Sequence, residues 1–212
     1  MIVQVKDFVK KVRVVVDMNR NSAPLLQEED IDTISFDEII QEKLTDAVRT
    51  VEQEAPLNML EQGHQFGDAV TWLENGKGWT LLPDDFMRLV VFKMSDWSHP
   101  VSEAITQDDP RYSRQWSKWK GVCGNPEKPI VAIVNRAEGQ ILEFFSCKDN
   151  MATVDQAMYI PFPTIDDNGG IDVSEKCYPA AVYRAAALAL YSIGDQLASN
   201  MMELSKSMLN QG

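Results

Sequence analysis

The stretch YPAAVYRAAALALYSIGDQLASNMMELSKSMLN, residues 178–210, decides the fold of this 212-residue chain. Its apolar positions recur at gaps of three and four residues, which places them in one stripe along a helix. The stripe consists of Val182, Ala186, Ala189, Ile193, Leu197, Met201, Leu204 and Met208. Pro179 stands where a first helical turn tolerates proline. We therefore expect one long helix from Tyr178 to about Asn210, with Gly194 as a point where it can kink.

Alanine is concentrated in the first half of this stretch, so another backbone can approach it closely. A stripe of this length must be covered by other elements, and the helical N-terminal segment is the obvious cover. Two interpretations stay open. The helix is either a plain core helix or one that also contacts neighbouring subunits.

Composition is that of a globular protein, with 44% hydrophobic and 25% charged residues. No window contains 18 uninterrupted apolar residues, so no membrane span is expected. The N-terminus lacks the order of a signal peptide, and three isolated cysteines favour a reducing compartment such as the cytosol. A net charge of −12 argues against a surface that grips nucleic acid by neutralising phosphates.

Two helices are expected before residue 56. The first, from Val5 to about Asp17, has apolar residues at helical spacing, although the run Val14–Val16 also permits a strand. The second begins where Ser35 and Glu38 have the spacing of a capping box, and it ends before Pro56. Residues 19–32 between them read as a polar, acidic loop.

The middle of the chain is rich in β-forming residues and in turn punctuation. Candidate strands cover residues 86–94, 130–134, 141–147 and 156–162. We predict an α+β fold, in which a helical bundle carries an inserted antiparallel β module. Its parts are the N-terminal helical segment 1–62, the β module 79–163 and the long C-terminal helix within 172–212.

Candidates for catalysis are few, and no cofactor or metal site is predicted. His64 and His99 lie in unrelated loops, outside any nucleophile or metal motif. The acid pairs at 84–85, 108–109 and 166–167 are better explained by turn chemistry than by paired catalytic carboxylates. The enzymatic alternative is a small hydrolase with a carboxylate site around Asp84, Asp85 and His99.

One segment reverses the acidic trend by interleaving basic and aromatic residues. It contains Arg111, Tyr112, Arg114, Trp116, Lys118, Trp119 and Lys120. Such a segment can stack on bases while it binds phosphates, but tryptophan and arginine are also enriched at protein interfaces. A third interpretation is structural, with Trp116 and Trp119 closing one side of the β module. All three stay open from the residues alone.

The order of these parts resembles a family of phage proteins, the head-to-tail connectors or tail tubular protein A-like adaptors of short-tailed bacteriophages. Residues 82–89, LPDDFMRL, are similar to the entry into the β part of such proteins. Further agreement in order comes from Ser35–Ile40, Tyr178–Ala181, Tyr112–Gln115, Pro126–Pro129 and Ile141. The segments around 63–78 and 96–109 match nothing in the pattern.

This resemblance implies a non-enzymatic virion protein that forms a homo-oligomeric ring, usually of twelve copies, between the portal protein and the tail. Such a ring extends the DNA channel and docks the tail tube or nozzle protein, without specific nucleic-acid binding. Similar assemblies occur in crAss-like phages. An acidic surface suits a channel wall that must repel passing DNA. The protein would be made in the host cytoplasm and reside at the phage neck.

The residues we expect at protein contacts fall in two regions. In the β module they are Trp97, Tyr112, Arg114, Trp116 and Trp119, and on the last helix Tyr183, Tyr191 and Met201. A competing hypothesis outside the phage family is an acidic cytosolic interaction module that acts through its tryptophan-rich β face.

Overall fold

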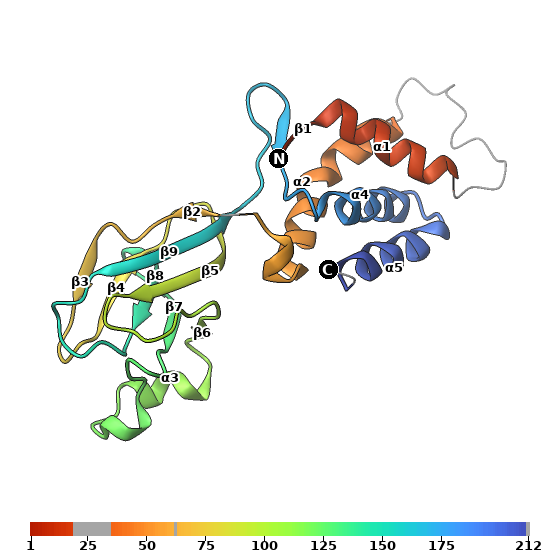
Figure 1. Cartoon of the computed structure of the whole chain (residues 1–212). Coiled ribbons are helices and arrows are strands. Elements are labelled where there is room, and N and C mark those ends of the chain that lie inside the picture. Colours follow the sequence, from red (N-terminus) through yellow and green to blue (C-terminus); the bar gives the residue numbers. More distant parts are fainter. Residues whose placement is uncertain (19–34, 62, 211–212) are drawn as a thin grey trace. The chain divides into compact units, whose positions relative to one another are not determined.

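The computed structural model describes residues 1–18, 35–61 and 63–210, and the chain divides into two compact units (Figure 1). A helical unit comprises residues 1–61 and 163–212, and a β unit comprises residues 62–162. The predicted α+β class is confirmed. Residues 63–78, which the sequence left unplaced, contribute strands to the β unit. The predicted acidic loop at 19–32 lies outside the described residues, which end at Met18 and resume at Ser35.

Both ends of the chain build the helical unit. Its elements are β1 (Ile2–Gln4), α1 (Val5–Met18), α2 (Phe36–Glu54), the short 3-10 helix η1 (Leu57–Met59), β10 (Gly170–Asp172), α4 (Tyr178–Ser192) and α5 (Leu197–Leu209). The two N-terminal helices form as predicted. At the start of α2, the Glu38 amide donates to Ser35 Oγ (3.3 Å) and the Ser35 amide donates to Glu38 Oε2 (2.8 Å).

The prediction of a single long C-terminal helix is wrong, because this part of the chain forms two helices, α4 and α5. Gly194 adopts φ +72°, which favours glycine. The Asp195 amide then donates to the Leu190 carbonyl (3.0 Å) and the Gly194 amide to the Tyr191 carbonyl (3.2 Å). These are the two bonds of a Schellman motif, which ends a helix. The Ser205 hydroxyl donates to the Ala180 carbonyl (2.9 Å), so α5 folds back along α4.

The helix α4 is the centre of the helical unit. Nine of its fifteen residues are buried, six of them alanines. The helices α1, α2 and α5 all pack against it (Figure 1). Alanine side chains allow this, because each partner helix can come close without displacing a large side chain.

A buried cation ties three of these helices together. Arg184 in α4 has a side chain only 4% exposed, and its Nη2 lies 2.6 Å from Glu54 Oε2 in α2. A second bond joins Nη1 to Glu54 Oε1 (3.3 Å), and Nε donates to Ser205 Oγ in α5 (3.2 Å). This bidentate pairing satisfies a charge that would otherwise be very costly to bury.

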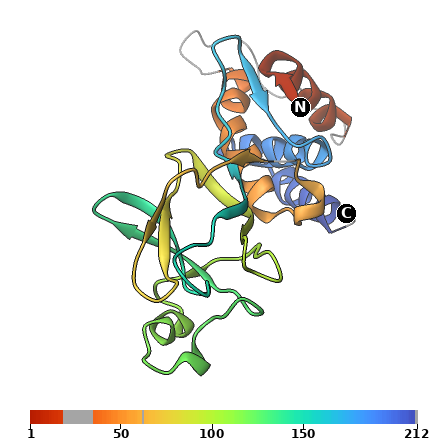
Figure 2. The ribbon, with the colours of Figure 1, turned by 60° about the vertical axis from the view of Figure 1, so that its left-hand side comes forward.

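Two sheets and a short helix form the β unit, seen from a second angle in Figure 2. One sheet has the order β2 (His64–Gln65), β9 (Val154–Pro161), β5 (Phe86–Met94). The other has the order β3 (Val70–Trp72), β4 (Gly78–Leu81), β8 (Gly139–Phe144), β7 (Val131–Arg136), β6 (Ile105–Thr106). The paired strands of these sheets are antiparallel except for β6 and β7, which run parallel. The prediction of an antiparallel β module is therefore wrong for this one pair.

The strand β8 separates two apolar cores. Leu142 and Phe144 join a core built from both sheets, where the Phe144 ring stacks on Phe92 at 5.9 Å between centroids. Ile141 and Phe145 belong to a second core on the other face of the five-stranded sheet, because side chains alternate along a strand. The helix α3 (Pro110–Gln115) covers this second core through Tyr112.

None of the helices within the described ranges combines the length and the apolar character that a membrane span requires.

We predict that Gly194→Ala lowers the free energy of unfolding by about 1 kcal/mol, because an alanine is strained at positive φ. An added Cβ at Gly194 meets nothing within 4 Å, so the effect isolates backbone conformation. Gly121→Ala is the matched control, since that Cβ also meets nothing and its φ is not in the left-handed region. Urea unfolding of both variants measures the difference. Equal stability of the two variants would contradict the helix break described above.

Candidate interaction surface

Two of the predicted contact residues are buried in the monomer, so their predicted contact role is corrected. Trp97 is 3% exposed and packs edge-on against Phe92, with ring centroids 5.6 Å apart. Met201 is 1% exposed in the core of the helical unit. Trp97 turns inward because its amide bonds the Met94 carbonyl at the end of β5. Met201 turns inward because α5 folds back on α4.

The other predicted residues divide between the two units. Tyr183 on α4 is half-buried and packs against the helical core, while Tyr191 at the end of α4 is 51% exposed. The remaining predicted residues all lie on or directly after α3 in the β unit. The structure therefore brings together Tyr112, Arg114, Trp116 and Trp119 but does not join them to the helical residues.

The exposed part of this region is called the basic–aromatic face below, and it consists of Arg114, Trp116, Lys118, Trp119 and Val122. It begins at α3, whose N-cap Asp109 accepts a hydrogen bond from the Arg111 amide (2.7 Å). The Arg111 guanidinium also pairs with Asp109 (2.7 Å), and these bonds lower the pKa of that carboxyl. The sequence predicts turn chemistry for the acid pair at 108–109, and in the structure Asp108 lies in a turn while Asp109 caps α3.

Trp116 has one packed side and one exposed side. Its ring meets Phe145 edge-on at 5.6 Å, and the Lys77 ammonium lies 4.8 Å from the ring centroid. Lys77 Nζ also donates to the Gln115 carbonyl. The indole is nevertheless 44% exposed. Trp116 therefore fixes the loop that follows α3 and contributes to the surface as well.

The loop after Trp116 is held by hydrogen bonds to residues of α3. Gln115 is 1% exposed; its amide Nε2 donates to the Arg111 carbonyl (2.9 Å) and its Oε1 accepts from the Gly124 amide (2.7 Å). The Cys123 thiol donates to the Arg114 carbonyl (3.4 Å). The 3-10 helix η2 (Lys120–Val122) closes this loop, and of Lys120 only the backbone is described.

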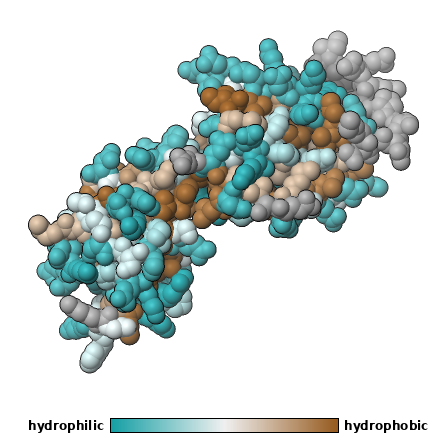
Figure 3. Space-filling view, viewed as in Figure 1, coloured by the Kyte–Doolittle hydropathy of each residue, from teal (hydrophilic) through white to brown (hydrophobic). Residues whose placement is uncertain are grey.

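Trp119 projects from this fixed loop with 79% of its surface exposed. Val122 lies three residues further on, donates its amide to the Trp119 carbonyl (3.1 Å) and is 51% exposed. Most of the surface visible in Figure 3 is hydrophilic, with apolar residues in smaller patches. A large aromatic side chain displayed on an ordered loop is typical of a binding hot spot, because little entropy is lost when a partner covers it.

Tyr112 has a supporting position beneath the face. Its hydroxyl donates to Glu143 Oε2 (2.8 Å), and Glu143, 1% exposed, pairs with Arg136. Burial and the neighbouring Glu143 carboxylate raise the pKa of Tyr112. The predicted contact at Tyr112 is thus half-buried and anchors α3 to the sheet.

Sequence reasoning missed the residues that make the face rigid. Gln115 could have been suspected, because it lies four residues after Arg111 on one helical face. Lys77 directly precedes β4 and Phe145 directly follows β8, both distant from Trp116 in sequence, and no local pattern indicated their contact with it.

The residues of the hydrolase alternative are not brought together. Asp84 and Asp85 precede β5, whereas His99 follows it. The segment after His99 pairs back onto β5 at Phe92. Six residues of strand, about 20 Å, separate Phe86 from Phe92. Asp85 instead accepts a hydrogen bond from the Tyr159 hydroxyl (2.8 Å), which with burial raises the pKa of Tyr159 to about 12.

Two hollows in the surface also lie elsewhere. A cavity of 520 Å³ in the β unit is lined by Phe66, Trp72 and residues 152–158, among others, and one of 580 Å³ lies between α2 and α4. Of the described residues that line them, none is Asp84, Asp85 or His99. Among residues 1–18, 35–61 and 63–210, no three or more His, Cys, Asp or Glu side chains are grouped to hold a metal ion.

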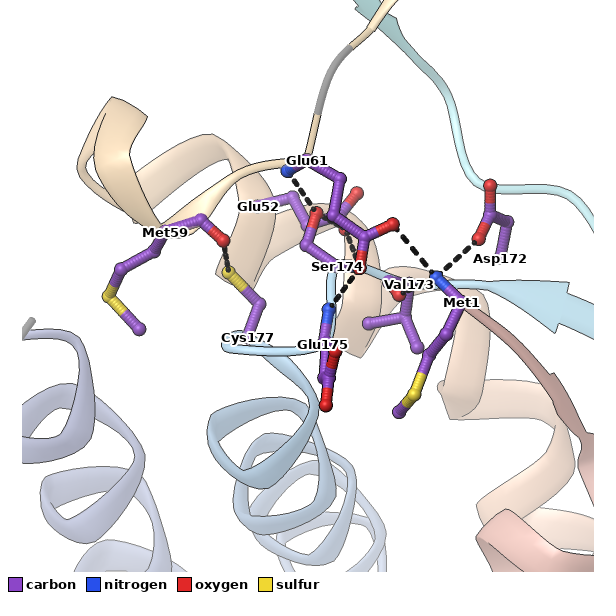
Figure 4. A network of polar contacts seen from close by, with 9 residues as sticks. All are labelled: Met1, Glu52, Met59, Glu61, Asp172, Val173, Ser174, Glu175 and Cys177. Carbon is purple, nitrogen blue, oxygen red and sulfur yellow. Dashed lines mark hydrogen bonds and ion pairs between the residues drawn. The ribbon is translucent and has the colours of Figure 1, made fainter.

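A second polar cluster lies in the helical unit, where its two chain segments meet (Figure 4). The Met1 ammonium pairs with Glu61 and Asp172, each at 3.1 Å, and donates to the Val173 carbonyl (2.7 Å). Glu61 also accepts a hydrogen bond from the Glu175 amide (2.8 Å). The cluster joins the end of the first segment to the start of the second.

Glu52 lies beneath this cluster and is 5% exposed. It accepts hydrogen bonds from the Ser174 amide (2.8 Å) and hydroxyl (2.9 Å). Burial raises the pKa of Glu52 despite these bonds, whereas the Glu175 amide and the Met1 ammonium lower the pKa of Glu61. Every group in Figure 4 binds another part of the same unit, so we assign the cluster to stability.

Comparison with known proteins gave no family model that matches the chain and no curated protein that matches its sequence. The functional argument accordingly rests on the residues of the face.

We predict opposite pH responses for Glu52→Gln and Glu61→Gln. The buried Glu52 has a raised pKa, so its charge opposes folding above that pKa; Glu52→Gln gains stability at pH 8, and the gain shrinks as the pH falls toward 4. Glu61 has a lowered pKa, so its carboxylate supports folding above the unfolded pKa of about 4.3. Glu61→Gln loses stability at pH 8, and the loss fades as the pH falls through the folded pKa. Urea unfolding at several pH values measures both, and responses of the same sign would contradict the assignment.

The two tryptophans of the face should differ in their effect on stability. Trp116→Ala removes packing on Phe145 and the contact with Lys77, so we expect a loss of about 1–2 kcal/mol. Trp119→Ala should change the free energy of unfolding by less than about 0.5 kcal/mol, because its side chain is mostly in solvent. Thermal and urea unfolding of both variants test this. A large loss for Trp119→Ala would show that its side chain supports the fold.

Proposed function

We propose that this chain is a non-enzymatic structural protein of a phage virion that forms a ring adaptor between the portal and the tail. The observation that carries the proposal is Trp119, 79% exposed on a loop held by part-buried hydrogen bonds of Gln115. An exposed aromatic side chain that is held in place beside basic residues is suited to contact with another macromolecule. The order of motifs along the chain supports the phage adaptor among the proteins that could use such a face.

The motif LPDDFMRL, which prompts the resemblance, spans the turn before β5 and the first part of that strand. The Phe86 amide donates to the Pro83 carbonyl (3.0 Å), which closes a turn directly before the strand. Phe86 then stacks on Tyr159, with ring centroids 5.7 Å apart, and Leu82 and Leu89 are buried in the same core. These residues therefore have structural tasks in this chain, which is consistent with a role without catalysis.

The charge of the chain supports a position beside passing DNA. At net −12, copies assembled in a ring present an acidic wall that DNA phosphates avoid. A channel that gripped DNA would slow its passage. In this proposal the ring extends the channel from the portal and offers docking sites to the tail tube or nozzle protein.

The test is the mass of the purified chain by light scattering over a concentration series, first alone and then with the portal protein. We expect a ring near twelve copies of the 23.9 kDa chain, either alone or on the portal. An unrelated portal protein is the control for unspecific association. A chain that stays monomeric with its portal would contradict the proposal.

The exposed face also favours a second candidate, an acidic interaction module that binds a partner outside any virion. It predicts that Trp119→Ala abolishes capture of that partner while the chain stays monomeric in all conditions. Trp119 is the better probe than Trp116, because Trp116 also packs on Phe145. A ring on the portal would exclude this candidate as the main function.

A further inference from the structure

We propose that the basic–aromatic face of one copy binds an acidic turn, Thr164–Asn168, of a second copy. The turn lies directly before β10 in the helical unit. This inference rests on the proposed function, because it names the contact that would join neighbours in the ring. It also makes a statement about self-association that can be tested without the portal.

The acidic turn is fully exposed, and its backbone is fixed. All five of its residues are exposed, while Ile165 forms an isolated bridge with Ile171 of β10. Asp166 Oδ1 accepts hydrogen bonds from the amides of Asn168 (2.8 Å) and Gly170 (2.7 Å). Gly169 at φ +75° completes the turn. The turn thus offers a preformed surface, beside β1 and β10 in Figure 1.

Charge is complementary between the two surfaces. Between Pro110 and Lys120 the sequence has four basic residues and no acidic one, whereas the turn carries Asp166 and Asp167 and no basic residue. Arg111 is already paired with Asp109, so Arg114 and Lys118 are the other exposed cations among the described side chains of this segment. Asp172 near the turn is paired with the Met1 ammonium (3.1 Å), so the negative charge that the turn offers comes from Asp166 and Asp167.

Apolar surface is complementary as well. On the face, Trp119 and Val122 are 79% and 51% exposed. Beside the acids, Ile165 is 44% and Ile2 is 69% exposed, and Ile2 lies against Gly170 of β10. Aromatic and aliphatic side chains surrounded by opposite charges are the usual anatomy of a protein contact, with an apolar centre and a polar rim.

The net charge explains why a second copy is the occupant. Two copies at −12 repel each other wherever acidic surfaces meet. The basic–aromatic face carries positive charge, so an acidic surface of another copy is attracted to it instead of repelled. Because the face and the turn are different surfaces, the contact is heterologous, and heterologous contacts generate rings when the rotation closes.

The test is a charge swap, with self-association measured by sedimentation equilibrium and by ring formation on the portal. Lys118→Glu and Asp167→Lys should each weaken association roughly tenfold, because each places like charges across the contact. The double variant Lys118→Glu with Asp167→Lys should restore it, since the pair is then reversed. Trp119→Ala should weaken association roughly thirtyfold as the loss of an aromatic hot spot.

Lys10→Glu on the exposed side of α1 is the matched control for Lys118→Glu, because both replace a lysine by a glutamate and so change the net charge equally, and Lys10 belongs to neither surface. Each variant is first checked for native unfolding behaviour. The contact is supported if the single variants weaken association and the double variant restores it. If rings form equally well with every single variant, the contact is overturned while the adaptor proposal stands.

Other outcomes separate the two proposals. Self-association that follows the charge swap in a chain that ignores the portal would support the contact and overturn the adaptor. A chain that never associates, alone or on the portal, overturns both. If Trp119→Ala instead abolishes binding of a single-stranded oligonucleotide and leaves self-association intact, the face belongs to nucleic acid and the contact is overturned.

Discussion

The ion pair of Arg184 with Glu54 is the interaction on which the helical unit depends. The guanidinium lies in the centre of an alanine-rich helix that is buried on most sides, so no solvent is available to stabilise its charge. Glu54 from α2 and Ser205 from α5 supply the bonds instead, and this requires all three helices to be in place at once. Arg184, a long cationic side chain among alanines, therefore reaches its partners in only one arrangement of the three helices.

The helical unit is also closed where its two chain segments meet. Residues 1–61 and 163–212 form this unit, and the Glu61 amide donates to Ser174 Oγ (3.4 Å) across the two segments. In the β unit, the helix α3 and the loop after it display the basic–aromatic face. Tyr112, Gln115 and Lys77 hold that loop from below, which leaves Trp119 free for a partner.

Periodicity predicted the helices and the β-rich middle because those signals are local. The capping box at Ser35 and the apolar spacing of α1 and α2 each lie within one turn or face of a helix. The sequence marked Gly194 as a point where the helix can kink, but the apolar gaps of three and four continue across it, and only the positive φ reveals that the chain folds back there. The burial of Trp97 and Met201 could not be predicted either, because it depends on packing against segments that are distant in the sequence. In the candidate surface, composition indicated the face, but its rigidity comes from Lys77 and Phe145, which no local pattern connects to Trp116.

The central claim is that an acidic chain assembles through its rigid basic–aromatic face. Hydroxyl-radical footprinting of the free chain and of the assembled ring tests this most directly, since it reports the exposure of each side chain in both states. The account predicts that Trp119 and the turn Thr164–Asn168 react readily in the free chain and both become protected on assembly, while buried Trp97 reacts slowly in both. A ring in which Trp119 stays as reactive as in the free chain would contradict it.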